Sequence, residues 1–126
     1  AKLYWKQSEK TDPLNTQQIH QGDGLIKRRS LFEKVSQLPI NIEVWELEEG
    51  VSEGDHSHED KGSLEEMYYF LSGEGEMTVN GKSIGVSAND SVMVPPGVDH
   101  GIRNIGKNPL KMIIIWGIPD GQYTNL

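Results

Sequence analysis

The chain has 126 residues, a net charge of −7 and no cysteine. This length is typical of one domain and excludes an enzyme with a separate cofactor domain. Without cysteine the chain cannot form disulfides, zinc ribbons, iron–sulfur clusters or a thiol nucleophile, so its four histidines are the strong nitrogen ligands. The acidic balance also lacks the clustered Lys and Arg that nucleic-acid binding requires, and we expect no nucleic-acid partner.

The sequence gives no indication of a membrane segment. Its longest purely apolar stretch, Met112 to Trp116, is five residues, whereas a bilayer crossing needs about 20. Residues 1–10 do not show the apolar core of a secretory signal. We therefore expect no membrane association and a cytoplasmic protein.

The first 39 residues read as an irregular polar arm with a possible strand from Leu25 to Arg29. Within it, Ser30-Leu-Phe-Glu33 fits a capping box and could open a short helix before Pro39. His20 lies in this arm among glutamines, and we expect it to be solvated.

From residue 40 onward, short runs of β-branched and aromatic residues alternate with Gly, Pro, Asn and Asp. This pattern predicts an all-β sandwich or barrel. The pair Asn80-Gly81 predicts a tight type I′ hairpin, because both central positions of that turn need positive φ. The expected strands are Ile40–Glu48, Glu65–Leu71, Gly75–Val79, Lys82–Val86, Ser91–Val94, His100–Asn104 and Leu110–Trp116.

The negative charge is concentrated in one segment. Twelve acids and one base lie between Glu43 and Glu76, which gives this segment a charge of −11. Most of these carboxylates are expected on a solvated surface, and two or three could be ligands.

Three histidines lie in positions that suit a metal site. His56 and His58 are two residues apart, so on an extended chain both imidazoles project from one face. His100 follows the rigid turn Pro95-Pro96-Gly97, which fixes its position. Strand alternation places Glu66 on the same face as Tyr68 and Phe70, opposite to Glu65. A Glu66 that points inward would be costly unless it is paired or bound to a cation, whereas on an edge strand both glutamates would lie in solvent.

These residues resemble the two motifs of the cupin family. Gly50-x5-His56-x-His58 followed by Glu66-x6-Gly73 is similar to the first motif, and Pro95-x-Gly97-x2-His100-x3-Asn104 is similar to the second; the likeness runs from about Ile40 to Trp116. Two departures stand out. Seven residues separate His58 from Glu66, where the family usually has three or four, so Glu65 competes for the ligand role. The six residues between Glu66 and Gly73 match the family's spacing and favour Glu66. Asn89 replaces the glycine that opens the second motif, and Asn also tolerates positive φ.

The resemblance implies a small antiparallel β-barrel, the double-stranded β-helix or jelly roll. It implies that His56, His58, Glu66 and His100 bind one divalent transition metal, whether Fe, Mn, Ni, Co, Cu or Zn. We expect one domain, with residues 1–39 as an arm and first strands packed on the barrel, 40–118 as the barrel core and 119–126 as a tail. The family also suggests a homodimer, although a monomer whose arm covers its own barrel would have the same sequence.

Three functions are compatible with such a site. The first is a metal-dependent enzyme, a dioxygenase or an isomerase or lyase, that acts on a small polar organic substrate. Tyr68 and Arg28 are then candidates for assisting groups, with Trp45 and Trp116 beside them, although Tyr68 could equally be core and Arg28 could be surface charge beside Lys27 and Arg29. The second is a non-catalytic module that binds a sugar or another small ligand. The third is a purely structural metal, which the open three-histidine, one-glutamate set disfavours.

Overall fold

The computed structural model describes residues 2–57 and 64–121, which form strands connected by turns and loops. The strands are β1 (Asn15–Gln17), β2 (Ile26–Ser30), β3 (Ile40–Leu47), β4 (Ser52–His56), β5 (Glu65–Ser72), β6 (Glu74–Val79), β7 (Lys82–Ser87), β8 (Ser91–Val94), β9 (His100–Asn104) and β10 (Leu110–Gly117). The predicted all-β fold is confirmed.

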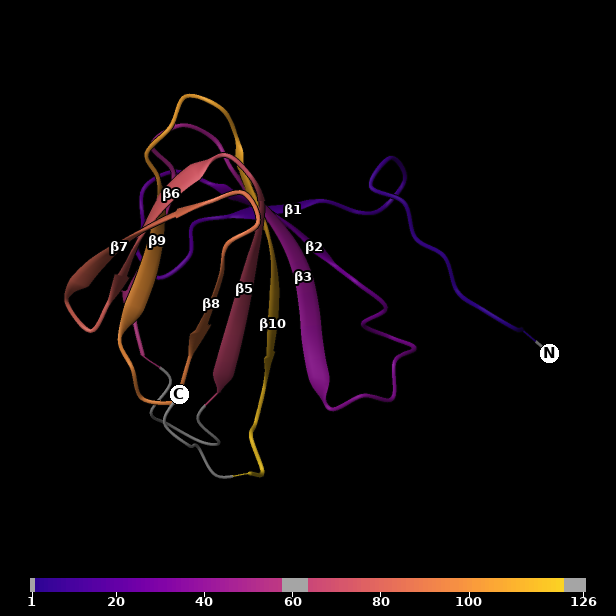
Figure 1. The fold of residues 1–126 in the computed structure, drawn as a ribbon. Coiled ribbons are helices and arrows are strands. Elements are labelled where there is room, and N and C mark those ends of the chain that lie inside the picture. The colour runs from indigo at the N-terminus through magenta and orange to yellow at the C-terminus, as the bar shows by residue number, and fades with distance from the viewer. Residues whose placement is uncertain (1, 58–63, 122–126) are drawn as a thin grey trace.

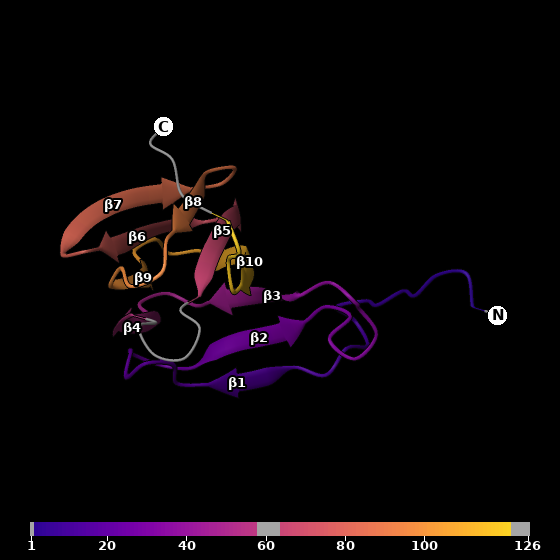
Figure 2. The same ribbon diagram turned by 90° about the horizontal axis from the view of Figure 1, so that it is seen from below.

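The strands form two antiparallel sheets that face each other across one core (Figures 1 and 2). One sheet has the order β1-β2-β3-β10-β5-β8 and the other has the order β4-β9-β6-β7. Strands that are neighbours in the sheets are often distant in sequence, as when β10 lies between β3 and β5. This arrangement is the jelly-roll barrel that the sequence predicts.

Alternation along β5 decides which side chains enter the core. Tyr68 and Phe70 are buried, as are Met77 of β6 and Ile102 of β9 from the opposite sheet. Fully burying side chains of this size contributes about 1.5–3 kcal/mol each. The alternate residues of β5 face outward, so the predicted division of this strand into two faces is confirmed.

The hairpin between β6 and β7 forms where it is predicted. Asn80 has φ of 51° and Gly81 has φ of 79°, as a type I′ turn requires. Asn89 also adopts positive φ, 73°, so its place in the second motif has the conformation that a glycine would have there.

Two strands were not expected from the sequence, and an expected helix is wrong. Apart from Thr16, β1 and β4 consist of residues with little β propensity, and they are strands because β2 and β9 pair with them. At Ser30–Glu33 the chain makes a turn rather than a helix: Phe32 has φ of 52°, and the amide groups of Val35 and Ser36 donate to its carbonyl.

The residues before β1 extend away from the two sheets (Figure 1). Side-chain hydrogen bonds connect these residues to β2: Gln7 Nε2 donates to the Ser30 carbonyl at 3.1 Å, and Arg29 donates to Asp12 at 2.8 Å. In the described part of the chain, no helix has the length and hydrophobicity that a membrane crossing needs.

Candidate metal centre

Pairing of β4 with β9 brings two of the predicted ligands together. His56 and His100 are partners in the antiparallel ladder, and their ring centroids are 4.3 Å apart. The sequence separates these histidines by 44 positions, so their contact depends on the tertiary pairing of the two strands.

Both imidazoles are held by backbone carbonyls. His56 Nδ1 lies 3.0 Å from the carbonyl oxygen of Gly54, and His100 Nδ1 lies 2.9 Å from that of Val98. A carbonyl can only accept, so each Nδ1 carries a hydrogen, and in the neutral imidazole Nε2 carries the lone pair. This support is the outer-shell hydrogen bonding usually found on histidines that ligate metals.

Glu66 reaches these histidines from the other sheet. Its side chain is 9% exposed, and its Oε2 lies 3.3 Å from His100 Nε2. One ligand atom each from His56, Glu66 and His100 lie within 4.8 Å of one another. Two imidazoles and a carboxylate are suitable donors for a divalent transition metal, so the residues present fit such an ion.

The other predicted carboxylate, Glu65, is half-buried and precedes Glu66 on the opposite face of β5. The inward position of Glu66 agrees with the preference drawn from its spacing to Gly73. The fourth predicted ligand, His58, lies outside the described residues.

Tyr68 supports the carboxylate from within the core. Its hydroxyl donates to Glu66 Oε2 at 2.8 Å, and burial raises its pKa well above the usual value. Tyr68 therefore stays a neutral donor, and it orients Glu66 rather than facing the cavity next to the site.

Sequence reasoning missed a second buried carboxylate, Glu53. Simple alternation along β4 puts Glu53 and His56 on opposite faces. The ladder between β4 and β9 is irregular between these two residues, and the irregularity turns both inward. Glu53 Oε2 lies 3.6 Å from His56 Nε2, with the Glu53 side chain 3% exposed. No local pattern marks such a register shift, and Glu53 is one acid among twelve in its segment.

The prediction that solvent surrounds His20 is wrong in part. Its ring stacks on that of His56 with centroids 3.5 Å apart and planes 10° from parallel, although 39% of its side chain is exposed. Its Nε2 lies 3.7 Å from Glu53 Oε2. A histidine in a polar, glutamine-rich segment gives no sign of this contact, which depends on the loop between β1 and β2.

Burial sets the protonation of the cluster. Desolvation, with a smaller contribution from the nearby Glu66 carboxylate, raises the pKa of Glu53 to about 8. Desolvation lowers the pKa of His56 to about 4. Burial opposes the charged form of His100, in which Nε2 donates to Glu66. That hydrogen bond, the bond to the Val98 carbonyl and the negative charges of Glu66 and Glu53 together outweigh burial, so the pKa of His100 is raised.

A cavity of about 170 Å³ adjoins the cluster. Arg28 lines it, and its Nε donates to Glu43 at 2.7 Å while its guanidinium lies over the Trp45 ring, 5.2 Å from the centroid. The predicted candidates Arg28, Trp45 and Trp116 thus lie at this cavity, whereas Tyr68 lies behind Glu66. The lining residues are Ile19, His20, Arg28, Trp45, Glu53, His56, Leu64, Glu66, Ile114 and Trp116.

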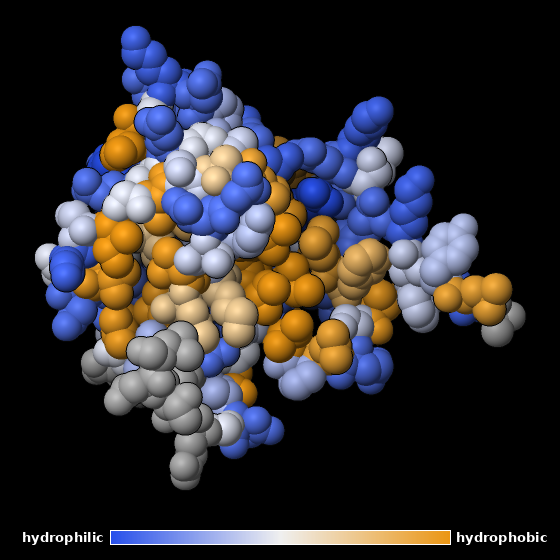
Figure 3. Space-filling model, viewed as in Figure 1, coloured by the Kyte–Doolittle hydropathy of each residue, from blue (hydrophilic) through white to orange (hydrophobic). Residues whose placement is uncertain are grey.

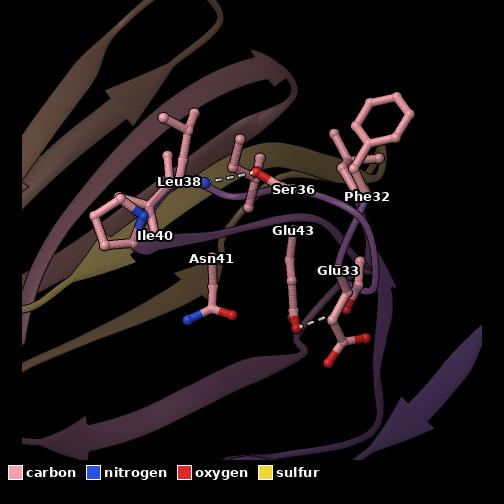
Figure 4. Close-up of a pocket in the computed structure, with 11 residues that line it drawn as sticks. Phe32, Glu33, Ser36, Leu38, Ile40, Asn41 and Glu43 are labelled. Atoms are coloured by element: carbon pink, nitrogen blue, oxygen red, sulfur yellow. Dashed lines mark hydrogen bonds between the residues drawn. The ribbon is translucent and has the colours of Figure 1, made fainter. Parts of the chain in front are cut away.

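A larger cavity, about 440 Å³, lies against residues 30–43 (Figure 4). None of the residues that line it is a histidine, so it is separate from the candidate metal centre. Glu43 is shared between the two regions, because Glu43 Oε2 accepts a bond from the Ser30 hydroxyl at 3.2 Å while Oε1 accepts from Arg28.

Two antiparallel sheets with imidazole and carboxylate side chains converging inside them define a small β-barrel protein with a potential metal site. The chain belongs to the cupin family, since the Cupin_2 model of a cupin domain matches residues 43–116.

Three known proteins illustrate the likeness. An uncharacterized protein of Methanocaldococcus jannaschii is 43% identical over 49 residues, which are 39% of each chain. The oxalate-binding protein of Thermotoga maritima is 38% identical over 69 residues, 55% of this chain and 54% of the relative. The crystal structure of a predicted oxalate decarboxylase from Thermotoga maritima is 25% identical, covers 89% of this chain and 97% of its own, and has a TM-score of 0.81. The chain thus spans about half of each curated relative or less.

Proposed function

We propose that this protein is a metal-dependent enzyme that acts on a small, oxygen-rich organic substrate. In this proposal His56, His58, Glu66 and His100 hold one divalent transition metal ion. When bound, the ion would act as a Lewis acid on the oxygen atoms of the substrate. The reaction would be a dioxygenation, or an isomerisation or lyase reaction such as decarboxylation.

One observation supports this proposal above the others. His56, Glu66 and His100 come from three different strands, yet one ligand atom of each falls within 4.8 Å of the others. The backbone carbonyls on both Nδ1 atoms set the tautomer that a ligand needs. A core without such a purpose would gain stability from apolar side chains in place of these groups.

The cavity residues suggest how this chain would bind the substrate. Arg28 supplies a positive charge to a cavity that Glu53 and Glu66 also line. Because its bond to Glu43 uses Nε, the terminal amino groups of the guanidinium retain donor hydrogens for a carboxylate. Trp45 and Trp116 add apolar walls that exclude water. A small carboxylate therefore fits this cavity better than a neutral sugar does, and the names of the Thermotoga maritima matches support the same substrate class.

A non-catalytic binding module is the second candidate. The oxalate-binding protein of Thermotoga maritima supports it, because its name describes binding and no reaction. The same ligand set and the same cavity would serve either function. Turnover is the property that separates the two.

The metal site is tested by its ligands. His56→Ala and His100→Ala should each reduce the metal content of the purified protein, measured by elemental analysis, because each removes an imidazole from the cluster. Glu66→Gln should do the same. Glu65→Gln is the matched control, since it removes an equal charge from the neighbouring residue on the other face of β5. Unchanged metal in the first three variants would contradict the assigned site.

The reaction is tested on the metal-loaded protein. Small mono- and dicarboxylates are the first substrates to screen, with oxygen consumption and carbon dioxide release as separate readouts. Oxygen uptake would identify a dioxygenase, and carbon dioxide release without oxygen uptake would identify a decarboxylating lyase. Saturable binding of a carboxylate by calorimetry with no product would favour the binding module. Arg28→Gln should weaken binding of a carboxylate while it leaves metal content unchanged.

A further inference from the structure

A second cluster of potential ligands adjoins the first and shares His56 with it. One ligand atom each from His20, Glu53 and His56 lie within 4.8 Å of one another. The predicted motifs contain His56 but neither His20 nor Glu53. The two clusters therefore meet at one imidazole, with Glu66 and His100 on one side and Glu53 and His20 on the other.

The distances in this cluster suit a cation better than direct hydrogen bonds. Glu53 Oε2 lies 3.6 Å from His56 Nε2 and 3.7 Å from His20 Nε2, and a normal N–H···O bond is about 2.7–3.2 Å long. Two donor atoms that each lie about 2.1 Å from one ion are roughly 3.6 Å apart when the angle at the ion is near 120°. The His20 and His56 rings are stacked nearly parallel, so they would have to tilt for both Nε2 lone pairs to point at one ion.

The backbone is shaped to hold His20 in this place. His20 and Gln21 both have positive φ, 51° and 61°, a conformation that costs a non-glycine residue about 1–2 kcal/mol. The Ile19 carbonyl accepts bonds from both Gly22 and Gly54 at 3.1 Å. A Cβ added at Gly54 would overlap the carbonyl oxygen of His20. Strain that is fixed by close backbone packing is characteristic of functional positions.

The buried carboxylate of Glu53 supplies the second argument. Its contact with the Tyr68 hydroxyl is 3.5 Å long, whereas the same hydroxyl lies 2.8 Å from Glu66. Tyr68 thus binds Glu66 firmly and Glu53 weakly. Two carboxyl groups buried this close disfavour ionisation of both, and a divalent cation would favour the ionised form of both.

We propose that His20 and Glu53 form, with His56, a second position for a divalent transition metal, adjoining the position formed by His56, Glu66 and His100. The inference rests on the metal centre of the proposed function. His56 Nε2 can bind one ion at a time, so the two positions serve the same ion. In the first position, the other ligands of the ion are Glu66 and His100. In the second position, the ion lies closer to the loop between β1 and β2, and its other ligands are Glu53 and His20.

Metal affinity in a set of combined variants tests this inference. The full chain is freed of metal with a chelator and titrated with Zn²⁺ by calorimetry. Glu66→Gln should weaken Zn²⁺ binding yet leave residual affinity, because the second position remains. Adding Glu53→Gln or His20→Asn to Glu66→Gln should weaken that residual binding by about tenfold or more. Asn is chosen at position 20 because it tolerates positive φ.

Glu49→Gln is the charge control. Glu49 is exposed and belongs to the same acidic segment, so on the Glu66→Gln background it should leave the affinity for Zn²⁺ nearly unchanged. Circular dichroism and the thermal unfolding midpoint of the metal-free variants show that each is folded. Glu53→Gln replaces a buried carboxyl group with an amide of the same shape and should leave this midpoint unchanged or raised.

The ligand environment provides a second readout. The visible absorption spectrum of the Co²⁺-loaded Glu66→Gln variant should change when His20→Asn is added, since the spectrum depends on the atoms bound to the ion. A purely structural His20 would lower stability without altering that spectrum.

The outcomes separate the two proposals. Failure of the wild-type chain to bind Zn²⁺ would overturn the metal centre, and with it this inference. Complete loss of Zn²⁺ binding in Glu66→Gln would overturn the second position while the first stands. The same holds if, on the Glu66→Gln background, Glu49→Gln and Glu53→Gln weaken Zn²⁺ binding equally.

Discussion

At the scale of single residues, the hydrogen-bonded support of the candidate ligands is the notable feature. His56 and His100 each bond a backbone carbonyl two residues earlier in the chain, and Tyr68 donates to Glu66. Each support fixes the direction of a donor atom before any ion arrives, which lowers the cost of binding one.

Replacing Tyr68 tests this support. Tyr68→Phe keeps the buried ring and removes the hydroxyl that orients Glu66. The affinity for a divalent metal should fall by about tenfold, as expected when an outer-shell partner is lost, and calorimetry measures the change. The matched control is Tyr69→Phe. Tyr69 lies on the other face of β5, and the variant removes an exposed hydroxyl that donates a hydrogen bond to Asn89. Equal metal affinity in the two variants would contradict the role of Tyr68.

At the scale of elements, the second motif includes one residue whose role is structural. Asn104 is 1% exposed at the end of β9. Its side chain donates to the carbonyls of Leu47 and Asn108, both at 2.9 Å, and accepts a bond from Gly106. It therefore joins β9 to the end of β3 and to the turn before β10, which holds the strand that bears His100.

The turn between β6 and β7 offers a test of local conformation. A Cβ added at Gly81 would meet no atom within 4 Å, but φ there is 79°. Gly81→Ala should therefore lower the free energy of unfolding by about 1–2 kcal/mol through backbone strain alone. Gly85→Ala, in the middle of β7, is equally open and lacks the positive φ. It should leave stability unchanged or raise it by about 0.5 kcal/mol. Urea denaturation measures both, and a loss of equal size in the two variants would contradict this account.

At the scale of the whole molecule, the outer face of the larger sheet is apolar. The strand register aligns Ile42, Ile115, Met67 and Met93 in one row across β3, β10, β5 and β8. Figure 3 shows hydrophobic surface over these strands. Met67 and Met93 are 43% and 45% exposed, and Tyr69 and Leu71 beside them are also exposed. A contiguous apolar surface on a folded domain usually marks an interface.

We expect a second copy of the chain to cover this face. A sheet face that packs on itself about a two-fold axis gives a closed dimer, the most frequent symmetry among oligomers. Analytical ultracentrifugation should show a dimer for the wild-type chain and a monomer for Met67→Lys. Ile84→Lys places the same charge on β7 of the other sheet and should remain dimeric. A monomeric wild-type chain would contradict the expected homodimer.

The sequence by itself determined the described strands other than β1 and β4, the hairpin at Asn80-Gly81 and the inward face of β5. These features are local, because they depend on residue alternation and on the φ values that Asn and Gly tolerate. The motif spacing also identified His56, Glu66 and His100, whose relative positions the structure then brought together.

Only the tertiary structure decided the remainder of the site. Glu53 turns inward because the β4–β9 ladder is irregular before His56, and His20 stacks on His56 because the loop after β1 packs against Gly54. β4 itself forms from residues of low β propensity because β9 supplies its hydrogen-bonding partners. Pairing across long sequence separations leaves no periodic pattern in the chain. Sequence patterns therefore indicated one group of residues that could hold a metal, and the described part of the folded molecule contains two such groups.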